Sequence, residues 1–209
     1  YEDVLGLVRK TEGWDKVEAL ARDGRGIIFL TPHLGCFEIV GPFIARHMPI
    51  TILYRPPRLR WTETPMLTGR RRGQVSMAPT DLKGVKALLK ALKCGQSAGI
   101  LPDQVPGDGR GSWSPFFGRS AYTMTLAARL SEMERVSVLL AFGERLPDGA
   151  GYVVHFLPPA APLQGDLQQR VDAINRSLEV LILRYPAQFL WGYNRYKTPA
   201  GMDANGEPA

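Results

Sequence analysis

His33 and Glu38 are the residues of this chain whose types and spacing most directly suggest a chemical reaction. Both belong to the segment Thr31-Pro-His-Leu-Gly-Cys-Phe-Glu38, in which Pro32 and Gly35 favour a shaped loop around the histidine. A carboxylate bound to one ring nitrogen of a histidine fixes the tautomer, which leaves the other nitrogen free to take a proton from a hydroxyl group. The two residues are therefore a candidate general base and its orienting acid.

Spacing alone leaves a second interpretation open. Positions five apart do not share a face of a continuous helix, so the two side chains meet only if His33 lies in a loop and Glu38 in the first helical turn. The alternative is a histidine packed in a turn and a solvated glutamate, which the helix dipole favours in a first turn. The H-x4-E spacing occurs often by chance, so it does not decide between the two.

The elements around this segment predict a parallel sheet. The apolar run at 27–30 has the character of a strand buried on both faces, 37–47 of a helix, and 50–54 of a second buried strand. This order is typical of a βαβ unit. His33 would then lie just beyond the carboxyl end of a strand, where open α/β sheets bind their ligands.

The rest of the chain continues the pattern. We expect an amphipathic helix at 82–92, a strand at 97–101, a Gly- and Pro-rich loop at 106–119, a helix at 121–130, strands at 136–142 and 152–157, and a helix at 167–184. The first twenty or so residues have helical spacing, and residues 200–209 are expected to be a disordered tail. No repeat or linker is evident. The sequence therefore predicts a single α/β domain over residues 1–199, with a mostly parallel central sheet flanked by helices.

Positive charge is concentrated in one stretch of the sequence. The formal net charge of the chain is +6, and Arg55, Arg58, Arg60, Arg70, Arg71 and Arg72 face a single acid, Glu63, between positions 55 and 72. Such a patch favours an anionic partner, for example a phosphorylated lipid or an acidic carrier protein, although a solvated face is equally consistent with scattered arginines. Nucleic acid is disfavoured as a partner because no helix-turn-helix, zinc-finger or RNA-binding pattern is present.

Other classes of site find no support in the sequence. Cys36 and Cys94 suit neither a zinc site nor a disulfide framework, and His33, His47 and His155 do not cluster with carboxylates at ligand spacing, so no metal or other cofactor is implied. No G-x-S-x-G elbow of a serine hydrolase occurs. No run approaches the ~18 apolar residues that span a bilayer. The chain begins with Tyr1 rather than Met, so we expect that an upstream segment, which could hold an anchor, was removed.

Five landmarks resemble the bacterial lipid A biosynthesis (lauroyl/myristoyl) acyltransferases, a branch of the lysophospholipid and glycerolipid acyltransferase superfamily. In chain order they are Thr31–Glu38; Tyr54-Arg-Pro56; Gly69-Arg-Arg-Arg72 with Asp81-Leu-Lys-Gly84; Pro102-Asp-Gln104 with Pro115-Phe-Phe-Gly118; and Tyr185–Trp191 with Asn194-Arg-Tyr-Lys197. They cover roughly residues 26–199. The fold that the resemblance implies is glycerolipid acyltransferase-like.

The resemblance also implies an activity. A fatty acyl chain would move from an acyl carrier protein thioester to a hydroxyl of a phosphorylated glucosamine disaccharide lipid, a lipid A precursor, at the cytoplasmic face of the inner membrane. This reaction belongs to lipopolysaccharide biosynthesis. His33 would act as the general base and Glu38 would orient it, while Arg70 and Asp103 match further residues that the family requires.

These further assignments have a physical rationale. An arginine grips a phosphate through two parallel hydrogen bonds, or stabilises the charge that develops on a thioester carbonyl oxygen. Arg72 suits either role as well as Arg70 does. Asp103 follows another predicted strand and is expected at the same sheet edge as His33, where its carboxylate would hold such an arginine. Arg195 is an undecided candidate for phosphate contact.

Two departures from the family leave alternatives open. The N-terminal transmembrane anchor of the family is absent, and positions 34–37 read Leu-Gly-Cys-Phe where relatives often have a polar or aromatic filling. The alternatives are an acyltransferase acting on another lipid acceptor, such as a lysophospholipid or glycolipid, and a non-catalytic module that binds anionic lipid. Acyl length, donor and oligomeric state are not determined by the sequence.

Overall fold

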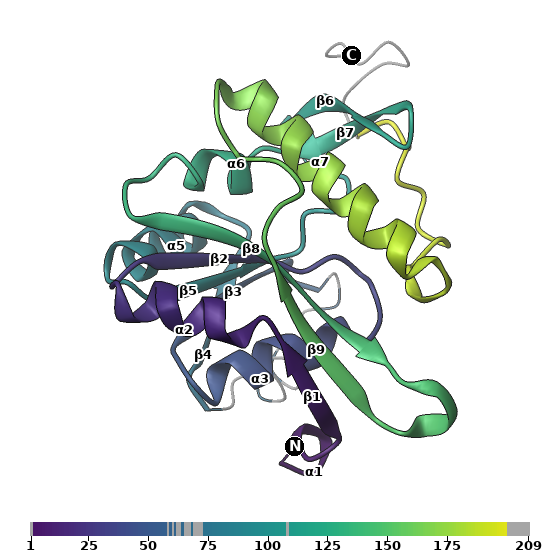
Figure 1. The fold of residues 1–209 in the computed structure, drawn as a ribbon. Coiled ribbons are helices and arrows are strands. Elements are labelled where there is room, and N and C mark those ends of the chain that lie inside the picture. Colours follow the sequence, from purple (N-terminus) through teal and green to yellow (C-terminus); the bar gives the residue numbers. More distant parts are fainter. Residues whose placement is uncertain are drawn as a thin grey trace.

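A computed structural model describes residues 2–57, 73–107 and 109–199, together with Leu59, Trp61, Thr64 and Thr68. The chain folds around a central sheet of seven strands in the order β1-β9-β8-β2-β5-β3-β4 (Figure 1). All neighbouring pairs are parallel except β8 and β9, which are antiparallel. The predicted single α/β domain with a mostly parallel sheet is thereby confirmed.

The strands of this sheet are β1 (Val8–Glu12), β2 (Gly26–Leu30), β3 (Ile50–Tyr54), β4 (Val75–Pro79), β5 (Ser97–Ile100), β8 (Val136–Arg145) and β9 (Tyr152–Leu157). A separate antiparallel hairpin consists of β6 (Gly111–Phe116) and β7 (Arg119–Met124). The α-helices are α1 (Glu2–Leu5), α2 (Trp14–Arg22), α3 (Val40–Ala45), α5 (Leu82–Lys93), α6 (Leu126–Leu130) and α7 (Leu167–Arg184). Short 3-10 turns are η1 (Phe37–Ile39), η3 (Pro147–Gly149) and η4 (Pro186–Gln188).

The central strands of the sheet are buried on both faces. Successive side chains of a strand point to opposite sides, so the residues of one strand join two different clusters. In β2, Ile28 and Leu30 join one hydrophobic cluster, whereas Ile27 and Phe29 join the other. Side chains from α5, α6 and α7 complete the first cluster, and side chains from α2, η1 and α3 complete the second. The continuous apolar run at 27–30 is thus explained by a central strand that helices cover on both faces of the sheet.

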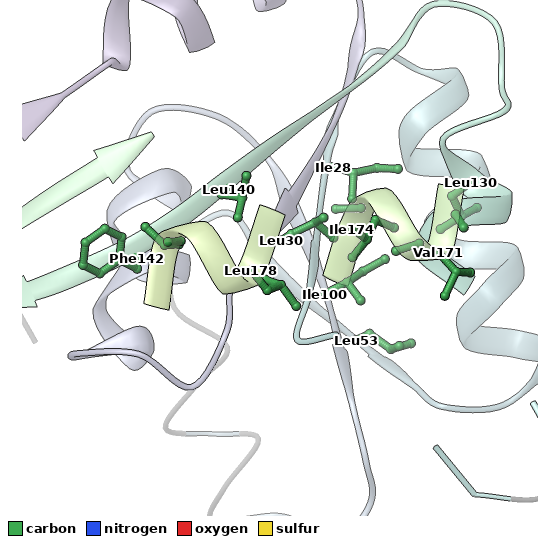
Figure 2. Close-up of a cluster of buried hydrophobic side chains, with 14 of the residues drawn as sticks. Ile28, Leu30, Leu53, Ile100, Leu130, Leu140, Phe142, Val171, Ile174 and Leu178 are labelled. Carbon is green, nitrogen blue, oxygen red and sulfur yellow. The ribbon is translucent and has the colours of Figure 1, made fainter. Parts of the chain in front are cut away.

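Helix α7 covers the first face with one apolar stripe. Its Val171, Ile174 and Leu178 recur at helical spacing and meet Leu30 and Leu140 of the sheet (Figure 2). The helix begins at a capping box. The Asp166 side chain accepts a hydrogen bond from the backbone N–H of Gln169, and the Gln169 side chain accepts one from the backbone N–H of Asp166. The long helix predicted at 167–184 is confirmed at both ends.

Four predicted elements differ from the structure. The region expected to be one N-terminal helix contains strand β1, which pairs with β9 and is separated from α2 by Gly13 at φ 78°. The loop expected at 106–119 contains β6, and the helix expected from 121 begins only at α6, because residues 119–124 form the partner strand β7. The helix expected at 37–47 is split into η1 and α3.

The topology brings two loops together at one edge of the sheet. β2 and β5 are parallel neighbours with Leu30 opposite Ile100. Residues 31–36 therefore leave the sheet beside residues 101–107, at the carboxyl ends of the two strands. These two loops carry His33 and Asp103. Among the described residues, no helix is long and apolar enough to cross a membrane.

Candidate functional site

Asp103 holds His33 by both its backbone and its ring. The Asp103 Oδ2 atom accepts a hydrogen bond from the His33 backbone N–H at 2.8 Å, and Oδ1 lies 2.8 Å from the ring Nδ1. The side chain of Asp103 is only 2% exposed, whereas the side chain of His33 is 15% exposed. A carboxylate accepts hydrogen bonds, so Nδ1 carries the ring proton of a neutral imidazole. The other nitrogen, Nε2, then presents a lone pair.

Gln104 contacts this second nitrogen. Its side-chain Nε2 lies 3.2 Å from the His33 Nε2, and with the tautomer assigned above the amide donates to the ring lone pair. The hydrogen bond marks where an O–H or N–H group of a substrate would approach. Gln104 belongs to the Pro102-Asp-Gln104 landmark, but no role was predicted for it. Its position directly after Asp103 is the feature of the sequence from which a role could have been predicted.

The backbone of the His33 loop is fastened on two sides. Gly35 has φ 58°, and its N–H donates to the Gln188 carbonyl at 2.9 Å. A Cβ atom at this position would lie 2.1 Å from the carbonyl oxygen of Gly143 in β8, so only glycine fits. The C-terminal segment adds a further bond, from the Leu190 N–H to the His33 carbonyl at 3.1 Å. The orientation of the imidazole therefore rests on β5, β8 and the segment after α7.

Glu38 lies in η1 with its side chain exposed, and it lines the same cavity as His33. The neighbouring Phe37 ring packs on the His33 ring with centroids 4.7 Å apart. The sequence analysis expected Glu38 to bind one ring nitrogen of His33, and in the structure Asp103 contacts Nδ1. The predicted role of Glu38 as the orienting residue stays a prediction.

The arginines predicted to bind substrate lie elsewhere or outside the described residues. Arg70 and Arg72 are not among the described residues, so their roles stay predictions. Asp103 was expected to hold an arginine, but both of its oxygens contact His33. Arg195, the undecided candidate for phosphate contact, is 5% exposed and is bonded to the hairpin, with Nη1 2.7 Å from the Tyr122 carbonyl oxygen and Nη2 2.6 Å from Thr123 Oγ1.

A cavity of about 1020 Å³ adjoins His33. Many of its lining side chains are apolar, and Ile52 and Leu53 are consecutive residues of β3 that point to opposite faces of the sheet. The cavity therefore reaches both faces around the end of this strand. Its described charged residues, apart from His33, are Glu38, Arg55, Arg110 and Arg129. An apolar chamber with a surplus of arginine suits a ligand that has both a hydrocarbon part and an anionic part.

The other two histidines have structural surroundings. His155 is buried between Glu12 of β1 and Glu144 of β8, at 3.1 and 2.7 Å, and stacks on Phe142. His47 packs its ring at 4.7 Å from Trp14. Within the described ranges, no group of three or more His, Cys, Asp or Glu residues is placed to hold a metal ion.

Comparison with known proteins decides the family. The model of the family described as bacterial lipid A biosynthesis acyltransferase matches residues 7–198. The chain belongs to this family. The resemblance seen in the sequence landmarks is thereby confirmed over nearly the whole chain.

Individual lipid A acyltransferases agree with this assignment. The chain is 30% identical to a lipid A biosynthesis lauroyltransferase of Escherichia coli (strain K12), over 94% of this chain and 65% of the relative. It is 28% identical to a lipid A biosynthesis palmitoleoyltransferase of the same organism, over 91% of this chain and 62% of the relative. A lipid A biosynthesis acyltransferase of Haemophilus influenzae is 29% identical, over 88% and 61%. The chain thus spans less than two thirds of the length of these relatives.

Proposed function

We propose that this lipid A acyltransferase family member moves a fatty acyl group from a thioester donor to a hydroxyl of a lipid A precursor, with His33 as the general base. The observation that carries the proposal is the 2.8 Å contact between Asp103 Oδ1 and His33 Nδ1. It leaves the Nε2 lone pair available next to a large, mostly apolar cavity. Without a fixed tautomer, a neutral histidine would present a lone pair at Nε2 only part of the time.

The reaction follows from this geometry. The acceptor hydroxyl displaces the Gln104 amide from Nε2 and gives its proton to His33 as its oxygen attacks the thioester carbonyl carbon. The tetrahedral intermediate then collapses, the carbon–sulfur bond breaks, and the imidazolium returns the proton to the departing thiolate. Asp103 stabilises the imidazolium between these steps. We retain Glu38 as a second carboxylate of the site, acting on His33 or on the acceptor hydroxyl from the cavity side.

The family and the lining of the cavity support the proposed donor and acceptor. The relatives are named for the transfer of lauroyl and palmitoleoyl groups in lipid A biosynthesis. The apolar lining suits such a chain, and Arg55, Arg110 and Arg129 suit an acceptor phosphate or an acidic acyl carrier protein. In this proposal Arg70 and Arg72 bind the acceptor phosphate or stabilise the oxyanion. The reaction takes place at the cytoplasmic face of the inner membrane, where the protein contacts the membrane surface.

A transfer assay with His33→Ala tests the proposal. Purified protein is given acyl carrier protein or CoA thioesters, with a lipid A precursor, a lysophospholipid or a glycolipid as acceptor, and the products are identified by mass spectrometry. We expect acylated lipid A precursor from the unaltered protein and none from His33→Ala. His47→Ala, which alters an exposed histidine away from the cavity, is the matched control and should keep its activity.

Three results would contradict parts of the proposal. Full activity of a folded His33→Ala protein would exclude His33 as the base. Product from a lysophospholipid or glycolipid alone would replace the acceptor. Salt-sensitive binding to anionic vesicles without any acylated product would instead support a non-catalytic lipid-binding module.

A further inference from the structure

Arg195 is a buried cation whose hydrogen bonds hold it in one place. Its two terminal nitrogens donate to the Tyr122 carbonyl and to Thr123 Oγ1. Thr123 Oγ1 also accepts from Asn175 Nδ2 at 3.0 Å and donates to the Ala121 carbonyl, so its hydroxyl is fully used. The guanidinium carbon lies 5.2 Å from the centre of the Phe116 ring. No hydrogen-bond partner for the buried Nε atom lies in the described part of the chain.

The chain places this cation near the His33–Asp103 pair. Tyr193, two residues before Arg195, accepts a hydrogen bond at its hydroxyl from the backbone N–H of Val105, two residues after Asp103. The segments around Asp103 and Arg195 therefore run beside each other. Burial lowers the pKa of the Arg195 guanidinium, and the negative charge of Asp103 opposes this shift most among the neighbouring groups. The described hydrogen bonds of Arg195 go to Tyr122 and Thr123 and not to Asp103, so the arginine acts on the carboxylate through space.

The charges of the three groups explain why such a cation is needed. Asp103 is 3% exposed, and a buried carboxylate beside a neutral imidazole is a net negative charge with little access to water. A proton added to the pair would lie either on the ring, as imidazolium, or on the carboxyl group, and a neighbouring positive charge disfavours both states. In both states Nε2 loses its place as the base, because the ring is charged or Nδ1 no longer faces a carboxylate.

We propose that Arg195 is a positioning residue for catalysis: its buried positive charge keeps the His33–Asp103 pair in the unprotonated state that removes a proton from the acceptor hydroxyl. This inference rests on the proposed function of His33. The arginine contacts neither substrate nor the reacting atoms, and it acts through Asp103 alone.

Other ionisable groups near the His33–Asp103 pair also contribute to the electrostatic potential there. Those lining the cavity are Cys36, Glu38, Tyr54, Arg55, Arg110 and Arg129. Tyr193 and Tyr196 lie next to Arg195, and the pKa of Tyr196 is raised by burial. The cavity arginines share their space with Glu38 and an open solvent path, so their charge is screened. Arg195 is enclosed, so its field is screened least.

The test is the dependence of kcat/KM on pH in Arg195→Met and Arg195→Lys. Methionine keeps an unbranched apolar stem and removes the charge. The acid limb of the profile should therefore move up by about one pH unit, and kcat/KM at pH values on this limb should fall roughly tenfold. Lysine keeps the charge, so the acid limb should stay in place even if kcat falls. Arg195→Gln, which keeps a polar but uncharged end group, serves if the methionine variant does not fold.

Arg170→Met is the matched control. Arg170 is a partly buried arginine of α7 that bonds the carbonyls of Leu163 and Gly165, away from the cavity. Its loss should lower thermal stability without moving the acid limb. An unmoved acid limb in Arg195→Met and Arg195→Gln, with lowered stability only, would make Arg195 a purely structural residue and overturn the inference.

A second readout does not depend on turnover. Diethyl pyrocarbonate modifies the neutral imidazole, and peptide mass spectrometry reports the modification of His33 separately from His47 and His155. The pH at which His33 becomes reactive should rise in Arg195→Met and Arg195→Gln but not in Arg195→Lys or Arg170→Met. If the protein transfers no acyl group, the proposed function fails and this readout still decides the state of the pair. An identical reactivity profile in all variants would contradict the inference.

Discussion

Asp103 uses its two oxygens on two parts of one residue, the backbone N–H and the ring Nδ1 of His33, each at 2.8 Å. The contact to the ring fixes the tautomer. The contact to the backbone N–H adds to the bonds from Gly35 and Leu190 that hold the main chain of the loop. Loss of either oxygen therefore has a different consequence.

Asp103→Asn should lower kcat by about 10³- to 10⁴-fold, because an amide nitrogen facing Nδ1 favours the tautomer with its proton on Nε2. Asparagine keeps one oxygen, so the bond to the His33 N–H and the fold should persist. Steady-state kinetics and circular dichroism measure the two effects. Glu38→Gln is the companion variant: a loss of the same size there would support the sequence-based assignment of Glu38 as an orienting residue. Unchanged kcat in Asp103→Asn would remove Asp103 from the mechanism.

Gly35→Ala should destabilise the protein by about 1–3 kcal/mol, since alanine is strained at φ 58° and its Cβ would meet the Gly143 carbonyl oxygen. The loop must move away from β8, so activity should fall more than the stability loss explains. Urea unfolding and kcat are the measurements. Gly118→Ala is the control, because it also has positive φ (73°) but nothing within 4 Å of the added Cβ. Equal effects of the two variants on kcat would show that the Gly143 contact does not matter for catalysis.

Ile52→Phe should shift the preferred acyl chain toward shorter donors. Ile52 lines the cavity and is only partly buried, so a larger side chain occupies space that the hydrocarbon would fill. The ratio of kcat/KM for a long and a short acyl thioester should fall about tenfold, the effect of roughly two buried methylene groups. Ile27→Val alters the same hydrophobic cluster without touching the cavity and should leave the ratio unchanged. A ratio unaffected by Ile52→Phe would place the acyl chain elsewhere.

Strand β1, at the edge of the sheet, should lose protection from hydrogen exchange at acid pH. The pKa of Glu12 is lowered, first by its hydrogen bond from Lys10 and then by His155 and the Lys10 charge. A carboxyl group with a lowered pKa in the folded state stabilises the protein above its unfolded pKa, and this contribution is lost as pH falls through the folded pKa. Hydrogen exchange of β1 amides from neutral pH down to pH about 3 measures the effect. Glu12→Gln should flatten this dependence, and an unchanged dependence would show that Glu12 does not anchor β1.

The order of strands and helices was largely predictable, and the exceptions have two causes. Strands 27–30, 50–54, 97–100 and 152–157 are mostly buried on both faces, so apolar and small residues dominate them and make them easy to recognise. Strand β1 is an edge strand with mostly exposed side chains, and its composition does not differ from that of a helix. The hairpin β6–β7 depends on packing against α7, which no local pattern reveals.

The sequence predicted the sheet edge at which the site lies, but not which carboxylate contacts the His33 ring. His33 and Asp103 each follow a buried strand, and this predicted one shared edge, as observed. Which carboxylate reaches Nδ1 depends on β2 and β5 being adjacent, and β5 lies about 70 residues farther along the chain. The spacing of Glu38 in the sequence carried no information on that adjacency. Arg195 is still farther away, and its burial follows from the packing of the C-terminal segment on the hairpin.

The bond from Leu190 to the His33 carbonyl joins a loop made early in synthesis to a segment made after every strand of the described sheet. His33, Asp103 and these strands are translated before α7 and the segment that follows it. The loop of His33 receives the support of Leu190 only after residues near 190 have left the ribosome. A growing chain can therefore pair its strands before the loop of His33 is fully held in position.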